Sequence, residues 1–308
     1  MRKILITGGA GFIPSSLADR LLQDEQNFII ALDNFSTGNE RNLPSKPPSN
    51  YQFLKCDVND YGSLSEIMNQ FDFDYIFHYA AIVGVQRTLD NPSSVLGDIQ
   101  GIQNILSLAR DKNVKRIFFA SSSEVYGESK EYPQHEELTP LNGKLPYAAV
   151  KKVGETIIDS FKFTFDLDYT IFRFFNTYGA KQNHDFVVSR FLDLALKNEP
   201  ITIYGDGSQT RTFCYIDDNI EVTLKILDEN LAVNQVLNLG SDIEISILSL
   251  AEKIIELTGS SSSIVHLPAL EKGDMARRKP VNDKMKQILG RELISLDEGL
   301  KRIISIYL

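Results

Sequence analysis

Short runs of apolar residues recur through the first half of the chain, and most are continuous rather than alternating with polar residues. A continuous apolar run is typical of a strand buried on both faces of a parallel sheet. The stretches between the runs are amphipathic, as in Ile99–Ala109. This alternation predicts right-handed crossovers and the α/β fold class, with a Rossmann-type doubly wound parallel sheet. The predicted strands are Lys3–Thr7, Phe28–Leu32, Tyr51–Cys56, Tyr75–Tyr79, Arg116–Ser121 and Tyr169–Phe174.

The pattern becomes less regular after about residue 175. Helices are predicted over Phe186–Lys197 and Leu248–Leu257, and Val236–Leu239 is apolar enough to form one more strand of the sheet. We therefore expect two parts of unequal character. They are a first domain over residues 1–175, with a returning segment near 213–240, and a smaller α/β region over 176–308.

Composition and charge narrow the classes of function. The 308 residues carry a formal net charge of −9, which argues against nucleic acid or an anionic membrane as a partner, because their binders present basic patches. No apolar run reaches the roughly 18 residues of a membrane span. The two cysteines, Cys56 and Cys214, lie far apart, as is typical of free thiols in a reducing compartment. We expect a cytoplasmic protein, and the cysteines and histidines show no metal-ligand spacing.

The first predicted strand leads into a glycine-rich segment with the spacing of a dinucleotide-binding loop. Gly8 and Gly11 would let the backbone turn tightly and approach a pyrophosphate at a helix N-terminus. The third glycine of that pattern is Pro14 here, which a first helical turn tolerates, so we expect a helix with altered packing. Asp33 ends the second strand, where a carboxylate accepts from ribose hydroxyls and repels a 2′-phosphate. NAD is therefore predicted rather than NADP, with Asp57 a candidate contact of the adenine amino group.

A tyrosine and a lysine lie four residues apart on one face of a predicted helix. They are Tyr147 and Lys151, and Ser121-Ser-Ser123 ends the preceding strand, at the sheet edge where ligands bind. An ammonium and an oxidised nicotinamide both stabilise a phenolate, so the pKa of Tyr147 should fall towards neutrality. Tyr147 can then accept a hydroxyl proton while hydride leaves the same carbon for NAD, and a serine hydroxyl can hold the substrate oxygen.

A series of further motifs completes this picture. In chain order they are Thr7-Gly-Gly-Ala-Gly-Phe-Ile13, Asp33-Asn-Phe-Ser-Thr-Gly38, His78-Tyr-Ala-Ala81, Ser121-Ser-Ser-Glu-Val-Tyr-Gly127, Tyr147 with Lys151, Arg173-Phe-Phe-Asn-Thr-Tyr-Gly179 and Tyr204-Gly-Asp-Gly-Ser-Gln-Thr-Arg211. Their order and spacing resemble the extended short-chain dehydrogenase/reductases that modify nucleotide sugars, the NAD-dependent epimerase/dehydratase family. The resemblance covers almost the whole chain.

The resemblance implies a role for each matched position. Residues 1–175 would form the NAD-binding Rossmann domain, and residues 176–308 would mainly bind substrate. The cofactor would be held at its pyrophosphate by Gly8, Gly11, Phe12 and Ile13, at its adenosine by Asp33, Asn34, Ser36, Gly38, Asp57 and Val58, along its channel by Ala80, Ala81 and Val83, and by Tyr147 and Lys151. The catalytic set would comprise Ser122, Tyr147 and Lys151, with Ser123 and Glu124 as candidates for later steps, and the nucleotide-diphosphate sugar would contact Asn176, Arg211 and Arg278. A homodimer is also implied, through a four-helix bundle of Ile99–Ala109 and Ala149–Phe163 from each copy.

Oxidation at sugar C4 is the first step shared by the family, and the later steps stay open. Where the dehydratases read Thr-Asp-Glu, this chain reads Ser122-Ser123-Glu124, so a base is present but the acid is a serine. The segment from Ser123 to Gly127 resembles nucleotide-glucuronate decarboxylases, whereas His78-Tyr-Ala-Ala-Ile-Val-Gly-Val resembles the 4-epimerases. The leading interpretation is a nucleotide-sugar epimerase or dehydrogenase. The alternatives are a decarboxylase or 4,6-dehydratase that uses Glu124 and, from another class, a non-catalytic NAD-sensing regulator, against which the presence of Tyr147 and Lys151 argues.

Overall fold

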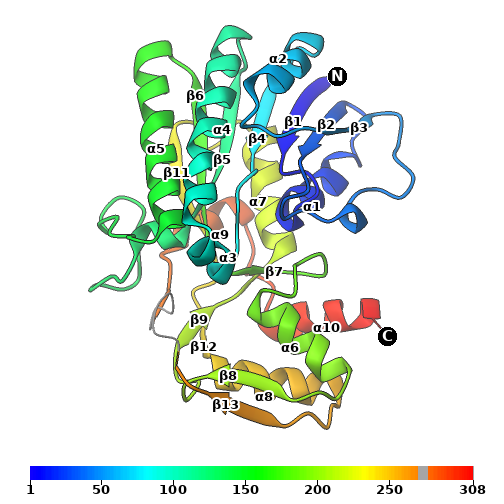
Figure 1. The fold of residues 1–308 in the computed structure, drawn as a ribbon, viewed down its shortest axis with the longest axis vertical. Helices are drawn as coiled ribbons and strands as arrows, with labels where there is room; N and C mark the ends of the chain where they lie inside the picture. The colour runs from blue at the N-terminus through cyan, green and yellow to red at the C-terminus, as the bar shows by residue number, and fades with distance from the viewer. Residues whose placement is uncertain (270–276, 308) are drawn as a thin grey trace. The chain divides into compact units, whose positions relative to one another are not determined.

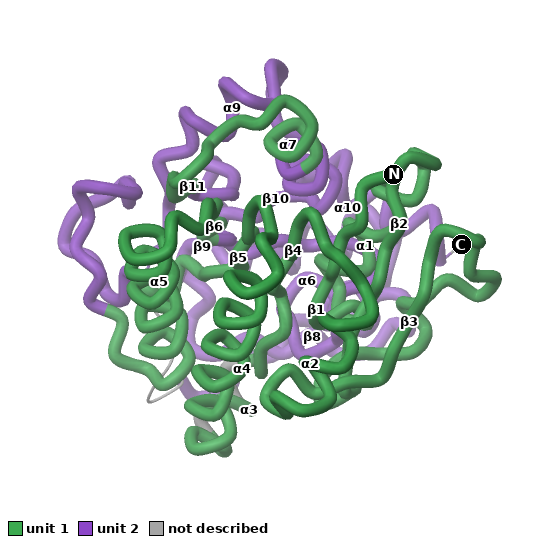
Figure 2. The backbone as a smooth tube through the Cα atoms, turned by 90° about the horizontal axis from the view of Figure 1, so that it is seen from above, with its two compact units in different colours: residues 1–125, 143–173, 224–237 green, residues 126–142, 174–223, 238–308 purple. Residues whose placement is uncertain are grey.

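The computed structural model describes residues 1–269 and 277–307. This part of the chain divides into two compact units, which Figure 2 colours separately. Unit 1 comprises residues 1–125, 143–173 and 224–237. Unit 2 comprises residues 126–142 and 174–223 together with the described part of 238–308.

The framework of unit 1 is a seven-stranded sheet with the strand order β11-β6-β5-β4-β1-β2-β3. The strands are β1 (Arg2–Thr7), β2 (Asn27–Asp33), β3 (Tyr51–Lys55), β4 (Tyr75–His78), β5 (Arg116–Ser122), β6 (Asp168–Phe174) and β11 (Gln235–Leu239). The neighbouring pairs from β3 to β5 are parallel, with Leu5 opposite both Ile30 and Ile76. These three side chains are fully buried, as their continuous apolar runs predict. Each predicted strand is present to within one residue at either end, so the predicted fold class is confirmed.

Helices cover both faces of this sheet. They are α1 (Phe12–Leu21), α2 (Tyr61–Gln70), α3 (Val85–Asp90), α4 (Pro92–Asp111) and α5 (Pro146–Phe165), with short 3₁₀ turns at η1 (Glu40–Asn42) and η2 (Ser123–Tyr126). Figures 1 and 2 show α2, α4 and α5 side by side on one face and α1 on the other. Pro92 and Pro146 begin α4 and α5, because a first helical residue has no intrahelical use for its N–H.

Unit 2 is built from short strand pairs and helices. Its strands β7 (Thr177–Tyr178), β8 (Ile201–Tyr204), β9 (Thr210–Thr212), β10 (Cys214–Tyr215), β12 (Glu244–Ser246) and β13 (Ile264–Leu267) form the pairs β7–β10, β8–β13 and β9–β12. The remaining helices of the chain are α6 (Val187–Leu196), α7 (Ile216–Asp228), α8 (Ile247–Thr258), α9 (Asp283–Leu289) and α10 (Leu296–Tyr307). The predicted helices at α6 and α8 are confirmed. The assignment of cofactor and substrate binding to separate parts of the chain stays a prediction.

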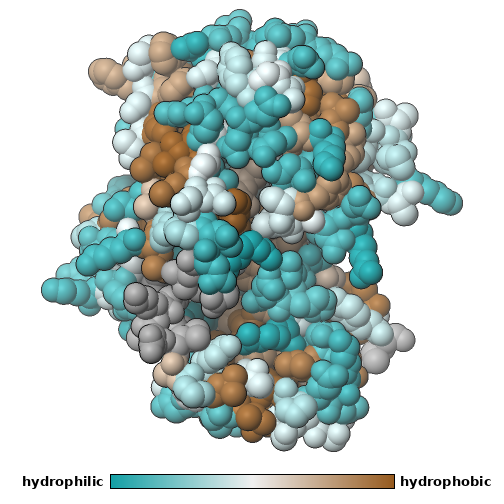
Figure 3. All heavy atoms as spheres, viewed as in Figure 1, coloured by the Kyte–Doolittle hydropathy of each residue, from teal (hydrophilic) through white to brown (hydrophobic). Residues whose placement is uncertain are grey.

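Apolar side chains reach the surface on α4 and α5. Leu96 is 48% exposed, Val153 is 39% exposed and Phe163 is 94% exposed. Figure 3 shows hydrophobic residues gathered over these helices, at the upper left of the view. None of the described helices is long and apolar enough to cross a bilayer. Val153 and Phe163 belong to Ala149–Phe163, a stretch that the resemblance assigns to subunit pairing, whereas Leu96 lies just before the other such stretch, Ile99–Ala109.

Candidate functional site

The loop between β1 and α1 approaches the end of β4 so closely that only glycine fits at Gly8. Gly8 has φ +72°, and a Cβ atom there would lie 2.9 Å from the backbone nitrogen of Ala80. Gly11 N donates to Gly8 O at 2.7 Å, which closes the turn, and α1 begins at the next residue. Within the described chain no side chain caps α1, so its first N–H groups can receive an anion.

Pro14 is accommodated within α1. It is the third residue of the helix and is buried, and the helix continues to Leu21. A Cβ atom on Gly11 would lie 3.2 Å from Pro14 Cγ, so the proline ring occupies the space beside the loop. The prediction that the helix forms despite the proline is confirmed.

The Asp33 carboxylate ties the glycine loop to the end of β2. Its Oδ2 accepts from Ala10 N at 3.0 Å, and its Oδ1 accepts from Phe35 N at 2.6 Å. Burial raises the pKa of Asp33, and the two backbone hydrogen bonds partly oppose that rise. Gly38 packs so closely that a Cβ atom there would lie 2.7 Å from Asp33 Oδ2. The carboxylate is therefore held in one orientation beside the loop.

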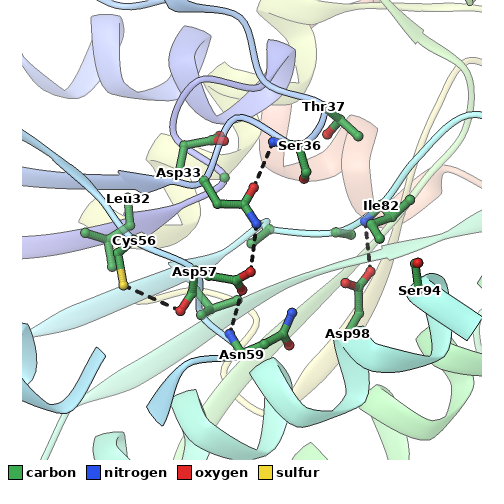
Figure 4. A pocket seen from close by; sticks show the side chains of 15 residues that line it. Leu32, Asp33, Ser36, Thr37, Cys56, Asp57, Asn59, Ile82, Ser94 and Asp98 are labelled. Carbon is green, nitrogen blue, oxygen red and sulfur yellow. Dashed lines mark hydrogen bonds between the residues drawn. The ribbon is translucent and has the colours of Figure 1, made fainter. Parts of the chain in front are cut away.

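A cavity of about 310 Å³ lies in unit 1, against the ends of the first four strands (Figure 4). Its position agrees with the rule that doubly wound sheets bind ligands beyond the carboxyl ends of their strands. The predicted cofactor residues that line it are Gly8, Asp33, Asn34, Ser36, Asp57, Val58, Ala80 and Ala81. Those that do not are Gly11, Phe12, Ile13, Gly38, Val83, Tyr147 and Lys151. Among the described residues no group of three or more His, Cys, Asp or Glu side chains could hold a metal ion.

Hydrogen bonds connect the ends of β2 and β3 across one wall of this cavity (Figure 4). Asn34 Nδ2 donates to Asp57 Oδ2 at 3.0 Å, and Asn34 Oδ1 accepts from Ser36 N at 2.8 Å. The other carboxylate oxygen of Asp57 accepts from Asn59 N at 2.8 Å. These hydrogen bonds link the side chains of this wall, which presents amide and carboxylate groups to the cavity.

The sequence prediction missed part of the lining. The missed residues are Leu32, Thr37, Cys56, Asn59, Ile82, Ser94 and Asp98. Most of them neighbour a motif, but Ser94 and Asp98 belong to the first turns of α4. Asp98 Oδ2 accepts from Ile82 N at 2.8 Å and so holds the segment that follows β4. The sequence did not predict that Asp98 lines the cavity, because it is an isolated carboxylate in a polar stretch and belongs to no motif.

Tyr147 and Lys151 lie on adjacent turns of α5, as their spacing predicts. Lys151 is 2% exposed, and its Nζ lies 5.6 Å from the centre of the Tyr147 ring and 4.9 Å from that of Phe119. Burial lowers the pKa of Lys151 to about 8, while the carboxylates of Asp98 and Glu155 act in the opposite direction. Within the described chain Nζ has no hydrogen-bond partner. A buried ammonium with three available donors fits a site completed by a bound ligand.

The three residues after β5 differ in exposure. Ser122, which ends the strand, is half-buried and its Oγ accepts from Glu124 N at 3.2 Å. Ser123 is 1% exposed, whereas Glu124 is half-buried. Of the two serines, Ser122 is the one whose surface a substrate can reach, and both catalytic assignments stay predictions.

The predicted substrate residues belong to unit 2. Asn176 has φ +36°, a conformation that asparagine tolerates better than most residues, and its Nδ2 donates to Thr212 O at 3.0 Å. Arg211 and Arg278 are 9% and 8% exposed. Their neighbour Arg277 donates to both carboxylate oxygens of Glu244, at 2.7 and 2.6 Å. The structure thus keeps two guanidinium groups inside unit 2, and their role at a diphosphate stays a prediction.

Comparison with known proteins relates this arrangement to a family. A UDP-N-acetyl-alpha-D-glucosaminuronate decarboxylase of Bacillus cytotoxicus is 35% identical, over 98% of this chain and 97% of the relative. A putative UDP-glucose 4-epimerase of Methanocaldococcus jannaschii is also 35% identical, again over 98% and 97%. The solved UDP-glucose 4-epimerase of Thermotoga maritima, with UDP-glucose, is 30% identical with a TM-score of 0.92, over 99% of this chain and 98% of its own.

A family model agrees with these relatives. The sequence model of the NAD dependent epimerase/dehydratase family matches residues 4–240, from the first strand to the end of the last strand of the sheet. The predicted enzyme class, Rossmann-type fold and NAD cofactor are confirmed at this level. The glycine loop, the carboxylate at the end of β2 and the pair of Tyr147 and Lys151 all lie within the matched residues. The chain belongs to the NAD dependent epimerase/dehydratase family.

Proposed function

We propose that this enzyme oxidises C4 of a nucleotide-diphosphate sugar and then reduces the same carbon from the opposite face, as a 4-epimerase. The pairing of Tyr147 with a buried Lys151 ammonium is the observation that carries the proposal. NAD, when bound, supplies the centre that takes up and gives back a hydride. The glycine loop, Asp33 and the cavity of about 310 Å³ would hold its adenosine and pyrophosphate.

The residues of the chain manage the proton. Lys151 stabilises a phenolate at Tyr147 through its charge, and that phenolate accepts the proton of the C4 hydroxyl. Ser122 would hold the same oxygen by a hydrogen bond and so fix its distance from Tyr147. In the second half of the reaction Tyr147 returns the proton to the C4 oxygen, so the enzyme returns to its starting state.

The two buried arginines of unit 2 suit the diphosphate. A guanidinium presents a planar fork of N–H donors that matches phosphate oxygens, and Arg211 and Arg278 concentrate positive charge in a protein whose net charge is −9. Asn176 would contribute an amide to the same ligand. These contacts would select nucleotide sugars over free sugars.

Decarboxylation is the second candidate, and Glu124 favours it. The 3₁₀ turn after β5 places Glu124 two residues from Ser122, and the decarboxylase of Bacillus cytotoxicus is as similar to this chain as the putative epimerase. A standard 4,6-dehydratase is disfavoured, because Ser123 has no proton to give near neutral pH and is 1% exposed. A C4 dehydrogenase needs neither Ser123 nor Glu124 for its reaction.

A panel of nucleotide sugars distinguishes these outcomes. Purified enzyme with NAD is incubated with UDP-glucose, UDP-N-acetylglucosamine, UDP-glucuronate and dTDP-glucose, and product mass is followed with the absorbance of reduced nicotinamide. We expect a product of unchanged mass and no net reduction. Loss of carbon dioxide would identify the decarboxylase, and loss of two hydrogens with net reduction the dehydrogenase. Loss of water, or NAD binding without any turnover, would overturn the proposal.

We further propose that two copies pair through α4 and α5, whose outer faces expose Leu96, Val153 and Phe163. Four helices would then bury apolar surface that a lone protomer leaves in water. The cytoplasm remains our proposed location, and the free thiols of Cys56 and Cys214 support a reducing compartment.

A further inference from the structure

Helix α5 carries a third polar residue in line with Tyr147 and Lys151. Glu155 lies one further turn along the helix, so the three side chains follow one another at intervals of four residues on one face. Glu155 is 8% exposed, and Lys151 is 2% exposed. A carboxylate this deeply buried must find partners, because burying an unpaired charge costs several kcal/mol.

Both strands beneath α5 supply those partners. Arg173, near the end of β6, donates to Glu155 from Nε at 3.0 Å and from Nη2 at 2.7 Å. Ser121, on β5, donates from its Oγ to the oxygen that also accepts from Nε. Arg173 and Ser121 are 4% and 3% exposed. Glu155 therefore connects α5 to the strand residue that immediately precedes Ser122.

Stability alone does not explain this cluster. A buried ion pair recovers little more than its own desolvation, and well-packed apolar residues of similar volume often replace one without loss. What apolar residues cannot supply is a negative charge one helical turn from Lys151. A second carboxylate, Asp98 of α4, also acts on Lys151 electrostatically.

The other titratable groups facing Lys151 do not supply that charge. They are Tyr147, on α5 itself, and His78, on β4. The His78 imidazole is neutral, because its Nδ1 accepts from the Thr7 hydroxyl at 2.9 Å within a buried environment. Glu155 and Asp98 are thus the two carboxylates that balance the buried ammonium among the residues described.

We propose that Glu155, held by Arg173 and Ser121, is a positioning residue that keeps Lys151 charged beside Tyr147 and fixes α5 against the strand end bearing Ser122. The proposal rests on the function above, in which the ammonium stabilises the Tyr147 phenolate. Burial lowers the pKa of Lys151 to about 8, so its charge at neutral pH has only a narrow margin. Loss of the Glu155 carboxylate would lower that pKa further and reduce the charged fraction near pH 7.

The titration of Lys151 tests the charge directly. Its pKa is measured by competitive acetylation over a pH series with peptide mass spectrometry, in wild type and in Glu155→Gln. Asp159→Asn is the matched control, because Asp159 is an exposed carboxylate on the same helix, two turns from Lys151. We expect Glu155→Gln to shift the Lys151 titration, and the alkaline limb of activity, down by about one pH unit, with Asp159→Asn at wild-type values.

Kinetics test the positioning. For Glu155→Gln we expect kcat to fall roughly 10- to 100-fold because α5 is no longer fixed against β5, with KM for the nucleotide sugar unchanged. Glu155→Leu combined with Arg173→Met serves if the single variant does not fold, because it leaves no charge unpaired. This double variant should fold and show a smaller downward shift of the Lys151 titration, because it also removes the positive charge of Arg173.

The outcomes separate the two proposals. A folded Glu155→Gln or double variant whose Lys151 titrates as in wild type would overturn the inference. If the wild-type enzyme turned over no nucleotide sugar, the proposed function would fail, while the acetylation titration would still decide whether Glu155 sustains the charge of Lys151.

Discussion

Two buried nitrogen bases of unit 1, His78 and Lys151, are held in opposite protonation states. The Thr7 hydroxyl oxygen accepts from Tyr79 N and Ala80 N, both at 3.1 Å, so its own hydrogen is directed to His78 Nδ1. The imidazole is therefore neutral, and it fixes the end of β4, which forms part of the cavity wall. Lys151 instead faces carboxylates and keeps its charge near neutral pH. Burial and the hydrogen bond from Thr7 keep His78 neutral, whereas nearby carboxylates favour the charged form of Lys151.

The neutral state of His78 makes stability depend on pH. Burial lowers its pKa to about 3, against an unfolded value of 6.5. Below pH 6.5 the unfolded chain therefore binds a proton that the folded chain does not bind. Stability from this residue is complete above pH 6.5 and is lost as pH falls towards 3. Between pH 7 and pH 5 we expect the free energy of unfolding to fall by about 2 kcal/mol. Urea titrations at both values measure it, and His78→Gln should lose less between them. An equal loss in both proteins would contradict the assignment.

Tyr147→Phe isolates the phenol. The change removes the hydroxyl that is proposed to exchange a proton with the substrate and leaves the ring, so turnover should fall by about 10²- to 10⁴-fold. The affinity for NAD, measured by calorimetry, should stay at its wild-type value. Tyr169→Phe is the control, because Tyr169 is a tyrosine of the same unit whose hydroxyl donates to Asp159 at 3.2 Å, away from the cavity. Unchanged turnover in Tyr147→Phe would show that another residue handles the proton.

At the scale of elements, the loop from β1 to α1 combines a required glycine with an unusual proline. Gly8 needs a positive φ and has no room for a Cβ atom beside Ala80. Pro14 contributes rigidity instead, because its ring fixes one φ angle of the helix and restricts the unfolded chain. The two residues therefore have separable effects, Gly8 on the cofactor site and Pro14 on the stability of α1.

Replacing each of the two residues tests that separation. Pro14→Gly should lower the free energy of unfolding by about 1–2 kcal/mol, because the unfolded chain gains freedom, and NAD affinity should change little. Gly8→Ala should weaken NAD binding about tenfold or more, because the loop must shift to relieve 1–3 kcal/mol of strain. Thermal unfolding and calorimetry give both quantities. Loss of NAD binding in Pro14→Gly alone would reverse the assignment.

The elements also show where sequence reasoning succeeds. Strands such as β1 and β5 were predictable, because burial on both faces leaves a continuous apolar run. The helix predicted from Ile99 begins at Pro92, because its first turns are largely exposed and carry no apolar period. That missing stretch contains Ser94 and Asp98, which line the cavity. Short strands such as β9 and β12 depend on each other rather than on their own sequences, so pattern alone does not reveal them.

At the scale of the whole molecule, the two proposed roles of α5, in catalysis and in subunit pairing, fall on opposite faces of the helix. The inner face of α5 carries Tyr147, Lys151 and Glu155, whereas its outer face exposes Val153 and Phe163. An exposed apolar helix face is unusual for a monomer and typical of an interface. If α5 pairs with its copy, the helix that bears the proposed catalytic residues is held in place from outside as well as by Arg173 from within.

Self-association should therefore depend on the outer face of α5. Sedimentation velocity of the wild type should give twice the chain mass of 34.7 kDa, and a stable pair would bury about 1,200–2,000 Å² in all. Val153→Glu places a charge where burial would leave it unpaired, so it should shift the protein towards monomers without changing its circular dichroism. Ile243→Glu is the control: it also replaces an exposed β-branched residue by glutamate, at a position of unit 2 that is 73% exposed. This variant should remain a dimer. Wild-type protein that sediments as a monomer, or equal dissociation in both variants, would mean that α5 does not hold the pair together.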